Sequence, residues 1–188
     1  QPSRRGWLAL GLAAALLPLL VLKYSGMLVP GLRDLYKPFG LAYYSLQLAG
    51  YLLDVWHGRT APTPSYARLW CYAGFFLSLT QGPFNRYNTL MPQLEAAPKT
   101  FETQRLVSGL QRSAWGYFKK FAIADRAAIV VSAAFADPAS FDRSQLIFAT
   151  VMYSFQLYAD FSGYTDIVLG MGEILGLHLP ENFRQPFF

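Results

Sequence analysis

The sequence contains little charge, a single cysteine and two histidines. Charged residues make up 14% of the chain, against roughly a quarter in typical soluble domains. Because Cys71 stands alone, an intrachain disulfide and a cysteine metal site are both excluded, and we expect Cys71 to be a small buried apolar residue. Walker loops, HExxH and G-x-S-x-G motifs are also absent from the chain. The common signatures of soluble enzymes are therefore missing.

The sequence is instead rich in apolar and aromatic residues. Hydrophobic residues are 53% of the chain, and the aromatic 16% includes 15 Phe and 12 Tyr. Such rings suit both apolar packing and the interfaces of a bilayer. The formal net charge of +5 does not indicate a nucleic-acid partner, because the basic residues are scattered between apolar runs. They are better placed to meet anionic lipid headgroups.

Long apolar runs bounded by basic residues predict an all-α fold, a polytopic transmembrane helical protein with at least four spans and no sheet. The runs are residues 6–22, 39–56, 66–80 and 123–135. The run 66–80 is short, so it either spans with a tilt or is re-entrant. We expect Asp54, at the end of its run, to be solvated by headgroups, and His57 to be a solvated loop residue.

Residues 105–121 form an amphipathic pattern. The apolar stripe consists of Leu106, Val107, Leu110, Ala114, Tyr117, Phe118 and Phe121. Arg105, Arg112 and Lys119 fall on the opposite side. This pattern predicts a helix that lies on the membrane surface with Arg112 and Lys119 facing headgroups. The excess of basic residues from 82 to 126 places this region on the cytoplasmic side.

A long helix is predicted to start at Ser144, as its N-cap, and to continue to about residue 177. It carries Asp160, on the same face as Gln156, and then Asp166 and Glu173, seven residues apart. A glycine beside a serine, Ser162-Gly163, predicts a kink that divides a spanning half from a buried half. Carboxylates in an apolar helix either line a polar cavity or pair with a neighbouring helix, and the pattern leaves both alternatives open.

Four segments of the chain resemble a known family. They are ADFSGYTDI (159–167), LGLHLPENFRQPFF (175–188), QGPFNRYNTLMPQL (81–94) and GLQRSAWGYFKKFAIADRAA (109–128). In kind and order they resemble the membrane-bound O-acyltransferase family, in the branch that acts in alginate O-acetylation and teichoic-acid D-alanylation. The resemblance covers most of the chain and implies a multi-pass protein of the bacterial cytoplasmic membrane.

The resemblance implies transfer of an acetyl or similar short acyl group to hydroxyls of an extracytoplasmic polysaccharide or cell-wall polymer. It also implies an acyl donor, acyl-CoA or an acyl carrier, on the cytoplasmic side, with no bound cofactor, and a polymer or a partner transferase as acceptor. The family's essential histidine belongs to downstream segments, and neither His57 nor His178 occupies its position. The chain lacks an initiator Met and stops directly after a motif. Residues 1–188 are therefore expected to be one partial, internal acyltransferase domain that does not catalyse alone.

By the same resemblance, several residues become candidates for lining the substrate tunnel or for supporting it structurally. They are Asp160, Ser162, Asp166, Gln156, Glu181, Asn182 and Arg184. Arg86 is a further candidate, because a guanidinium can hold a carboxylate or phosphate with two hydrogen bonds; its alternative partners are a lipid headgroup or a helix end. No catalytic or metal-binding residue is predicted. The alternative to an enzyme is a different class of function, a transporter or channel segment whose intramembrane acids relay protons or ions.

Overall fold

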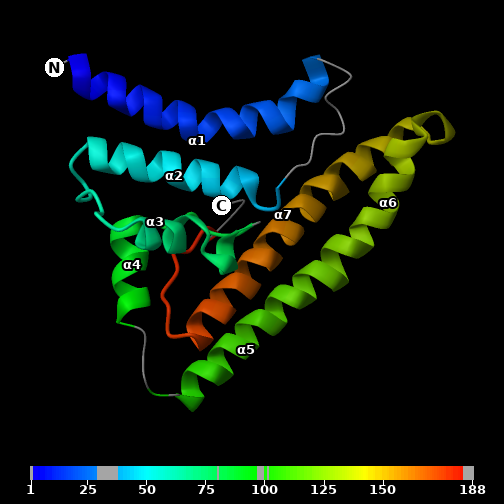
Figure 1. The fold of residues 1–188 in the computed structure, drawn as a ribbon. Coiled ribbons are helices and arrows are strands. Elements are labelled where there is room, and N and C mark those ends of the chain that lie inside the picture. The colour runs from blue at the N-terminus through cyan, green and yellow to red at the C-terminus, as the bar shows by residue number, and fades with distance from the viewer. Residues whose placement is uncertain (1, 29–37, 80, 97–99, 101, 184–188) are drawn as a thin grey trace. The chain divides into compact units, whose positions relative to one another are not determined.

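The computed structural model describes residues 2–28, 38–79, 81–96, 100 and 102–183. Within these residues the secondary structure is entirely helical, without a strand, so the predicted all-α class is confirmed there. The chain forms two compact units (Figure 1). Unit 1 consists of Gln1–Thr80 and Phe84–Ala96, and unit 2 of Gln81–Pro83 and Ala97–Phe188.

Unit 1 begins with two helices that lie side by side, α1 (Pro2–Leu28) and α2 (Leu41–Trp56) (Figure 1). Gly11 lets Leu52 approach α1, since a β-carbon at Gly11 would lie 3.2 Å from the Leu52 Cδ1 atom. Within α1, residues 5–26 are long and apolar enough to cross a membrane. Among the described helices α1 alone meets both criteria, so the predicted set of four or more spans is not reproduced by length and composition.

The apolar run 66–80 does not form one spanning helix, which corrects the prediction. It forms α3 (Tyr66–Ala73) and a short 3₁₀ turn, η2 (Phe76–Ser78). The helix ends at Gly74, whose amide closes the last turn on the Trp70 carbonyl. The segment that follows is not an open loop, because it contains α4 (Tyr87–Glu95) with Pro92 inside it. Unit 1 is thus two long helices with short helical pieces attached.

Unit 2 is a long antiparallel helical hairpin (Figure 1). Its first arm is one continuous rod made of α5 (Thr103–Phe118), the π-helical turn η3 (Lys119–Ala124) and α6 (Asp125–Ala136). The charges at Asp125 and Arg126 lie inside the apolar run 123–135, and they do not interrupt the helix. The Asp125 amide instead donates to the Lys120 carbonyl, five residues back. A 3₁₀ turn, η4 (Pro138–Ser140), closes the tip.

The second arm is α7 (Arg143–Ile174), a single helix of 32 residues. Its N-cap is Asp142 and not Ser144 as predicted. Asp142 has extended backbone (φ −75°, ψ 167°), and its Oδ1 atom accepts from the Gln145 amide at 2.9 Å. The Gln145 side chain accepts from the Asp142 amide in return, at 3.0 Å, which completes a capping box. Ser144 is the second residue of the helix, two positions after the cap.

Glycines bring α5 and α7 into backbone contact. Gly109 and Gly116 of α5 face Gly170 and Gly163 of α7, and a β-carbon at Gly116 would lie 2.5 Å from the Gly163 carbonyl oxygen. Small residues spaced in this way allow two helices to approach more closely than other side chains permit. This contact explains why Gly163 does not divide α7: the helix is continuous there, and the glycine serves the packing.

The two faces of α5 are arranged opposite to the prediction. The buried residues of α5 are Gly109, Ser113 and Gly116. Val107, Leu110, Tyr117 and Phe118, all from the apolar stripe, are exposed. The basic side of the helix therefore packs on α7, and the apolar side points outward. Arg112 and Lys119 do not face outward toward headgroups, because acids on α7 attract them.

Candidate functional site

A row of polar contacts, here called the polar seam, joins the rod to α7 inside unit 2. It pairs Ser108 with Glu173, Arg112 with Asp166 and Glu181, Lys119 with Asp166, and Lys120 with Asp160. Three acids predicted from their position in an apolar helix, Asp160, Asp166 and Glu173, are thus all engaged by the rod. The seam runs beside the glycine contact, where the two helices are closest.

Asp166 lies at the centre of the seam between two cations. Its Oδ1 atom lies 3.3 Å from the Arg112 guanidinium, and its Oδ2 atom contacts the Lys119 ammonium. The side chains of Asp166 and Lys119 are only 17% and 13% exposed. Because water reaches this ion pair so little, removing one member leaves the other charge buried without a partner, which is costly. Asp166 therefore has the environment of a residue that joins two helices.

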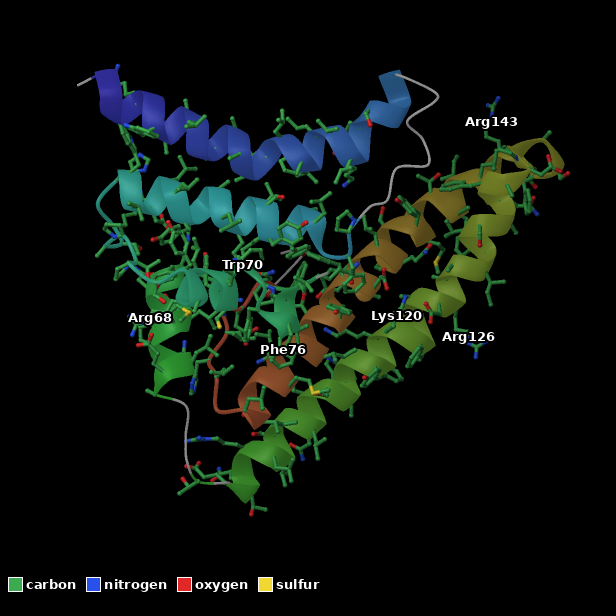
Figure 2. The ribbon with its side chains drawn as sticks, viewed as in Figure 1. Arg68, Trp70, Phe76, Lys120, Arg126 and Arg143 are labelled. Atoms are coloured by element: carbon green, nitrogen blue, oxygen red, sulfur yellow. The ribbon has the colours of Figure 1, made fainter. Side chains whose placement is uncertain are left out.

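Asp160 occupies a more open part of the seam. Its Oδ1 atom is 2.6 Å from the Lys120 ammonium, which also lies 2.9 Å from Asp125 on its own rod. Figure 2 shows Lys120 on the side of the rod toward α7, and Arg126 on the outer side. Asp160 also borders a cavity of about 520 Å³ within unit 2. The other residues that line it are Gln81, Tyr153, Ser154, Leu157, Tyr158, Phe161 and Phe183.

The segment after α7 folds back along the helix. Gly176 has a positive φ of 74°, and the amides of Gly176 and Leu177 bond to the Glu173 and Gly172 carbonyls. This is a Schellman motif, which ends the helix and reverses the chain. Glu181 then reaches Arg112 at 2.6 Å, so the returning segment is tied to α5.

The remaining residues of the returning segment take different positions. The Phe183 ring packs edge-on against Phe161 and Tyr158, at centroid distances of 5.2 and 5.8 Å. Asn182, a predicted site residue, is exposed. The predicted residue Arg184 lies outside the described residues. Glu181 and Phe183 thus tie the returning segment to α5 and to α7, respectively.

Two predicted site residues on α7 carry buried polar atoms without a hydrogen bond among the described residues. Ser162 is 1% exposed, and its Oγ atom has no partner there. The Gln156 Oε1 atom is also buried and has no hydrogen-bond partner there. Buried polar groups are nearly always paired. These two atoms are thus the open hydrogen-bonding positions of α7, whereas its acids are already engaged.

Unit 1 holds a second polar cluster, around Asp54. Asp54 was expected to be solvated at a helix end, but its side chain is only 7% exposed. Its Oδ2 atom accepts from the Arg86 guanidinium at 2.8 Å, and Arg59 lies 3.6 Å from Oδ1. Arg86, predicted as a ligand-facing residue, keeps 60% of its side chain exposed. Burial of Asp54 follows from this pairing, because two guanidinium groups replace the water that it loses.

A chain of buried hydrogen bonds lies beside Asp54 and was not predicted. Gln47 donates to the Tyr72 carbonyl at 2.9 Å, the Tyr72 hydroxyl donates to the Asn85 carbonyl at 2.8 Å, and Asn85 donates to Ser78 at 3.2 Å. Burial in α3, a helix too short to cross a bilayer, raises the pKa of Tyr72 to about 12, and the Asp54 carboxylate also raises it. The Tyr72 hydroxyl therefore remains a donor. The available signal was the seven-residue spacing of Gln47 and Asp54, which places both on one helix face.

The two histidines and the cysteine are all exposed. His57 is exposed at the C-cap of α2, as predicted, and its Nδ1 atom lies 2.7 Å from the Leu53 carbonyl oxygen. His178 is also exposed. Cys71 is exposed, which corrects the prediction of a buried residue. The described part of the chain contains no group of three or more His, Cys, Asp or Glu residues that could hold a metal ion.

Comparison with known proteins places these features in a family. The chain is 31% identical over its full length to a Pseudomonas fluorescens protein named "Probable alginate O-acetylase AlgI", of which it covers 37%. It is 29% identical to the peptidoglycan O-acetyltransferase of Helicobacter pylori, again over 100% of the chain and 42% of the relative. The teichoic acid D-alanyltransferase of Bacillus subtilis is 27% identical over 82% of the chain and 40% of its own length. The chain is a homologue of part of these acyltransferases.

The matches confirm the resemblance, noted from the sequence motifs, to proteins of alginate O-acetylation and teichoic-acid D-alanylation. The chain spans 37% to 42% of the length of the relatives quoted. No protein-family model matches the sequence. In the structure the motif ADFSGYTDI supplies the seam acids Asp160 and Asp166 together with the glycine contact at Gly163. The motif that carries the resemblance is therefore the part of α7 that is fastened to α5.

Proposed function

We propose that the protein to which this chain belongs is a membrane O-acyltransferase. It transfers an acetyl or similar short acyl group to hydroxyls of an extracytoplasmic polysaccharide or cell-wall polymer. The observation that carries the proposal is the similarity over the whole chain to two O-acetyl-transferring proteins. A third relative, named for D-alanyl transfer to teichoic acid, has the same reaction type with a different acyl group. These names favour an enzyme over the transporter or channel alternative.

We further propose that the chain is part of a single multi-pass domain of the bacterial cytoplasmic membrane. One helix, α1, is suited to crossing a bilayer by its length and composition. In unit 2, large apolar side chains are exposed on all three helices, such as Phe118, Ile129 and Phe148. The charged side chains of the seam lie between the helices instead. An apolar exterior around a polar interior is the arrangement that lipid favours.

In this proposal the chain supplies the framework of the reaction chamber, and the catalytic histidine belongs to another part of the enzyme. Asp166 and Glu181 fix the hairpin and the returning segment through Arg112. Ser162 and Gln156, whose buried oxygens have no partner in the described chain, are placed to bind a group from the acceptor or from a neighbouring segment. Asp160, Asn182 and Arg184 complete the set of proposed tunnel residues in this part of the chain, and Arg86, in unit 1, is proposed separately as a residue that binds an anionic group.

The proposed reaction requires an acyl donor and an acceptor. The donor is acyl-CoA or an acyl carrier on the cytoplasmic side, and no cofactor stays bound. The acceptor is the extracytoplasmic polymer or a partner transferase that passes the acyl group to it. Membrane lipid surrounds the protein. The basic residues Arg112, Lys119 and Lys120 are paired with acids within the seam.

The test is to express the full-length protein in a bacterial host whose own polymer O-acetylation genes are deleted. Base-labile acetate on the extracellular polysaccharide and on peptidoglycan is then measured against an empty vector. We expect one polymer to gain ester-linked acetate. If neither polymer nor teichoic acid gains an acyl ester while the protein is abundant in the membrane fraction, the proposed function is wrong.

A further inference from the structure

The end of α2 brings two arginines to one carboxylate. Gly58 has a positive φ of 72°, and the amides of Gly58 and Arg59 bond to the Val55 and Asp54 carbonyls. This Schellman motif reverses the chain directly after the helix. As a result, the Arg59 side chain returns over Asp54, and its Nη1 atom lies 3.6 Å from Oδ1.

Arg86 approaches the same carboxylate from the other side. It has extended backbone, with φ −92° and ψ 143°, immediately before α4, and its Nη1 atom lies 2.8 Å from the Asp54 Oδ2 atom. Each carboxylate oxygen thus holds one guanidinium. The buried Asp54 holds both arginines in place, while the side chains of Arg59 and Arg86 stay 65% and 60% exposed.

The charges in this cluster do not cancel. Two guanidinium groups carry two positive charges, and Asp54 neutralises one of them. Each guanidinium has five N–H donors, and only one nitrogen of each is committed to Asp54 among the described residues. The donors that remain are presented to the surroundings in a geometry that matches the oxygens of a phosphate group.

We propose that Arg59 and Arg86, held together by Asp54, form a binding site for a phosphate group, from an anionic lipid headgroup or a soluble phosphate compound. Asp54 sets the positions of the two arginines and reduces the entropy that each loses on binding. The site lies in unit 1, which also carries the membrane-suited helix α1 and exposed aromatic residues such as Trp70 (Figure 2). Such aromatics are typical of the headgroup level. The site is independent of the proposed acyl transfer.

Arg59 offers the cleaner variant. Removal of Arg86 would leave the buried Asp54 without its short ion pair and would risk misfolding. In Arg59→Gln, Asp54 keeps Arg86 at 2.8 Å, so the fold should be retained. Arg143→Gln is the matched control, because Arg143 is exposed at the tip of the hairpin and has no ion pair among the described residues (Figure 2). Both variants lose one positive charge.

The experiment measures equilibrium binding of a fluorescent short-chain phosphatidylglycerol to the purified full-length protein in neutral detergent. Removing one charged hydrogen-bonding group should weaken binding about tenfold in Arg59→Gln, with wild-type affinity in Arg143→Gln. Arg59→Lys, which keeps the charge but loses the forked geometry, should fall between. Unfolding temperatures are recorded for each variant, so that a folding defect is recognised.

Competition with inorganic phosphate separates the two sources of the ligand. Displacement of the lipid by phosphate at millimolar concentration would show that the phosphate group is sufficient. Loss of binding in Arg59→Gln without such displacement would assign the site to a lipid headgroup. Equal affinities of wild type and Arg59→Gln, or equal losses in Arg59→Gln and Arg143→Gln, would overturn the proposal. Neither result depends on whether the enzyme transfers acyl groups.

Discussion

Gly116 of α5 and Gly163 of α7 face each other across the hairpin of unit 2 with no space for a side chain between them. A β-carbon on Gly116 would lie 2.5 Å from the Gly163 carbonyl oxygen, and one on Gly163 would lie 2.8 Å from the Gly116 carbonyl oxygen. The obstructing atoms are backbone, so they cannot move away as a flexible side chain would. The contact makes the separation of the two arms sensitive to a single methyl group.

Gly116→Ala should therefore destabilise the hairpin by about 1–3 kcal/mol, the usual cost of overpacking. The measurement is thermal unfolding of the full-length protein in detergent. Gly50→Ala is the control, because Gly50 is also inside a helix but a β-carbon there meets nothing within 4 Å. That control should be neutral or slightly stabilising, as alanine is the better helix former. Equal melting temperatures for Gly116→Ala and wild type would contradict the close approach.

Arg112→Gln should loosen the segment that returns after α7. Arg112 connects α5 both to Asp166 and to Glu181, and Glu181 is the charged anchor of the returning segment. Hydrogen exchange of residues 175–183 should rise several-fold in this variant. Arg105→Gln is matched to it, since Arg105 lies on the same helix and, among the described residues, its ion pair is with Glu102, three residues away. If both variants leave exchange in 175–183 unchanged, Arg112 does not hold the segment.

The cap of α7 should give the tip of the hairpin an acid-sensitive stability. Hydrogen bonds from the Ser144 hydroxyl and then from the Gln145 amide hold the pKa of Asp142 below its usual range. A carboxyl whose pKa is lower in the folded state stabilises the fold above its unfolded pKa of about 3.9, and this contribution is lost as the pH falls through the folded pKa. The protection factors of the amides at the start of α7, which correct for the intrinsic pH dependence of exchange, should therefore fall in acid.

Asp142→Ala isolates this contribution. The difference in exchange between wild type and Asp142→Ala should be full at neutral pH and should shrink below the usual carboxyl pKa of about 3.9. In Ser144→Ala the largest cause of the lowered pKa is removed, so the difference should begin to shrink at higher pH. A difference that stays constant from neutral to strongly acidic pH would rule out the ionised cap.

In the full-length protein, Asp160→Asn and Asp166→Asn should reduce acyl transfer far more than His57→Ala. The acids are paired with cations of the rod, whereas His57 is exposed at a helix end. Protein abundance is measured beside transfer, because an unpaired Lys119 or Arg112 can unfold the hairpin. A loss of abundance equal to the loss of activity makes these acids structural. Normal transfer in both Asn variants, with none in His57→Ala, would place the function elsewhere.

The positions of most helices could be predicted from the sequence. Apolar runs located α1 and α2, and the amphipathic pattern located α5, because these signals depend on residues a few positions apart. The cost of burying charge also singled out Asp160 and Asp166 correctly as residues that need partners. The partner of the polar side of α5 could not be predicted from the neighbouring sequence. Arg112 and Asp166 are 54 residues apart, and their pairing depends on how the two helices meet.

Other failures have similar physical causes. Asp54 looked like a residue at a wet helix end, but Arg86, from a distant loop, makes its burial possible. Residues 66–80 looked like one apolar helix, but Gly74 ends it after eight residues. Asp125 interrupts the apolar run 123–135 in the sequence. The π-helical turn η3 accommodates it within one continuous rod.

That turn also explains how both halves of the rod keep the same neighbour. A π-helical turn bonds five residues back instead of four, so it holds about one residue more than a regular α-helical turn while the flanking helices keep the direction in which they face. Deleting one residue within Lys119–Ala124 would therefore restore regular winding and leave the buried side of α6, Ala127, Val131 and Ala134, against α7. The widened turn thus absorbs one extra residue of the sequence without changing the face that either half of the rod presents to α7.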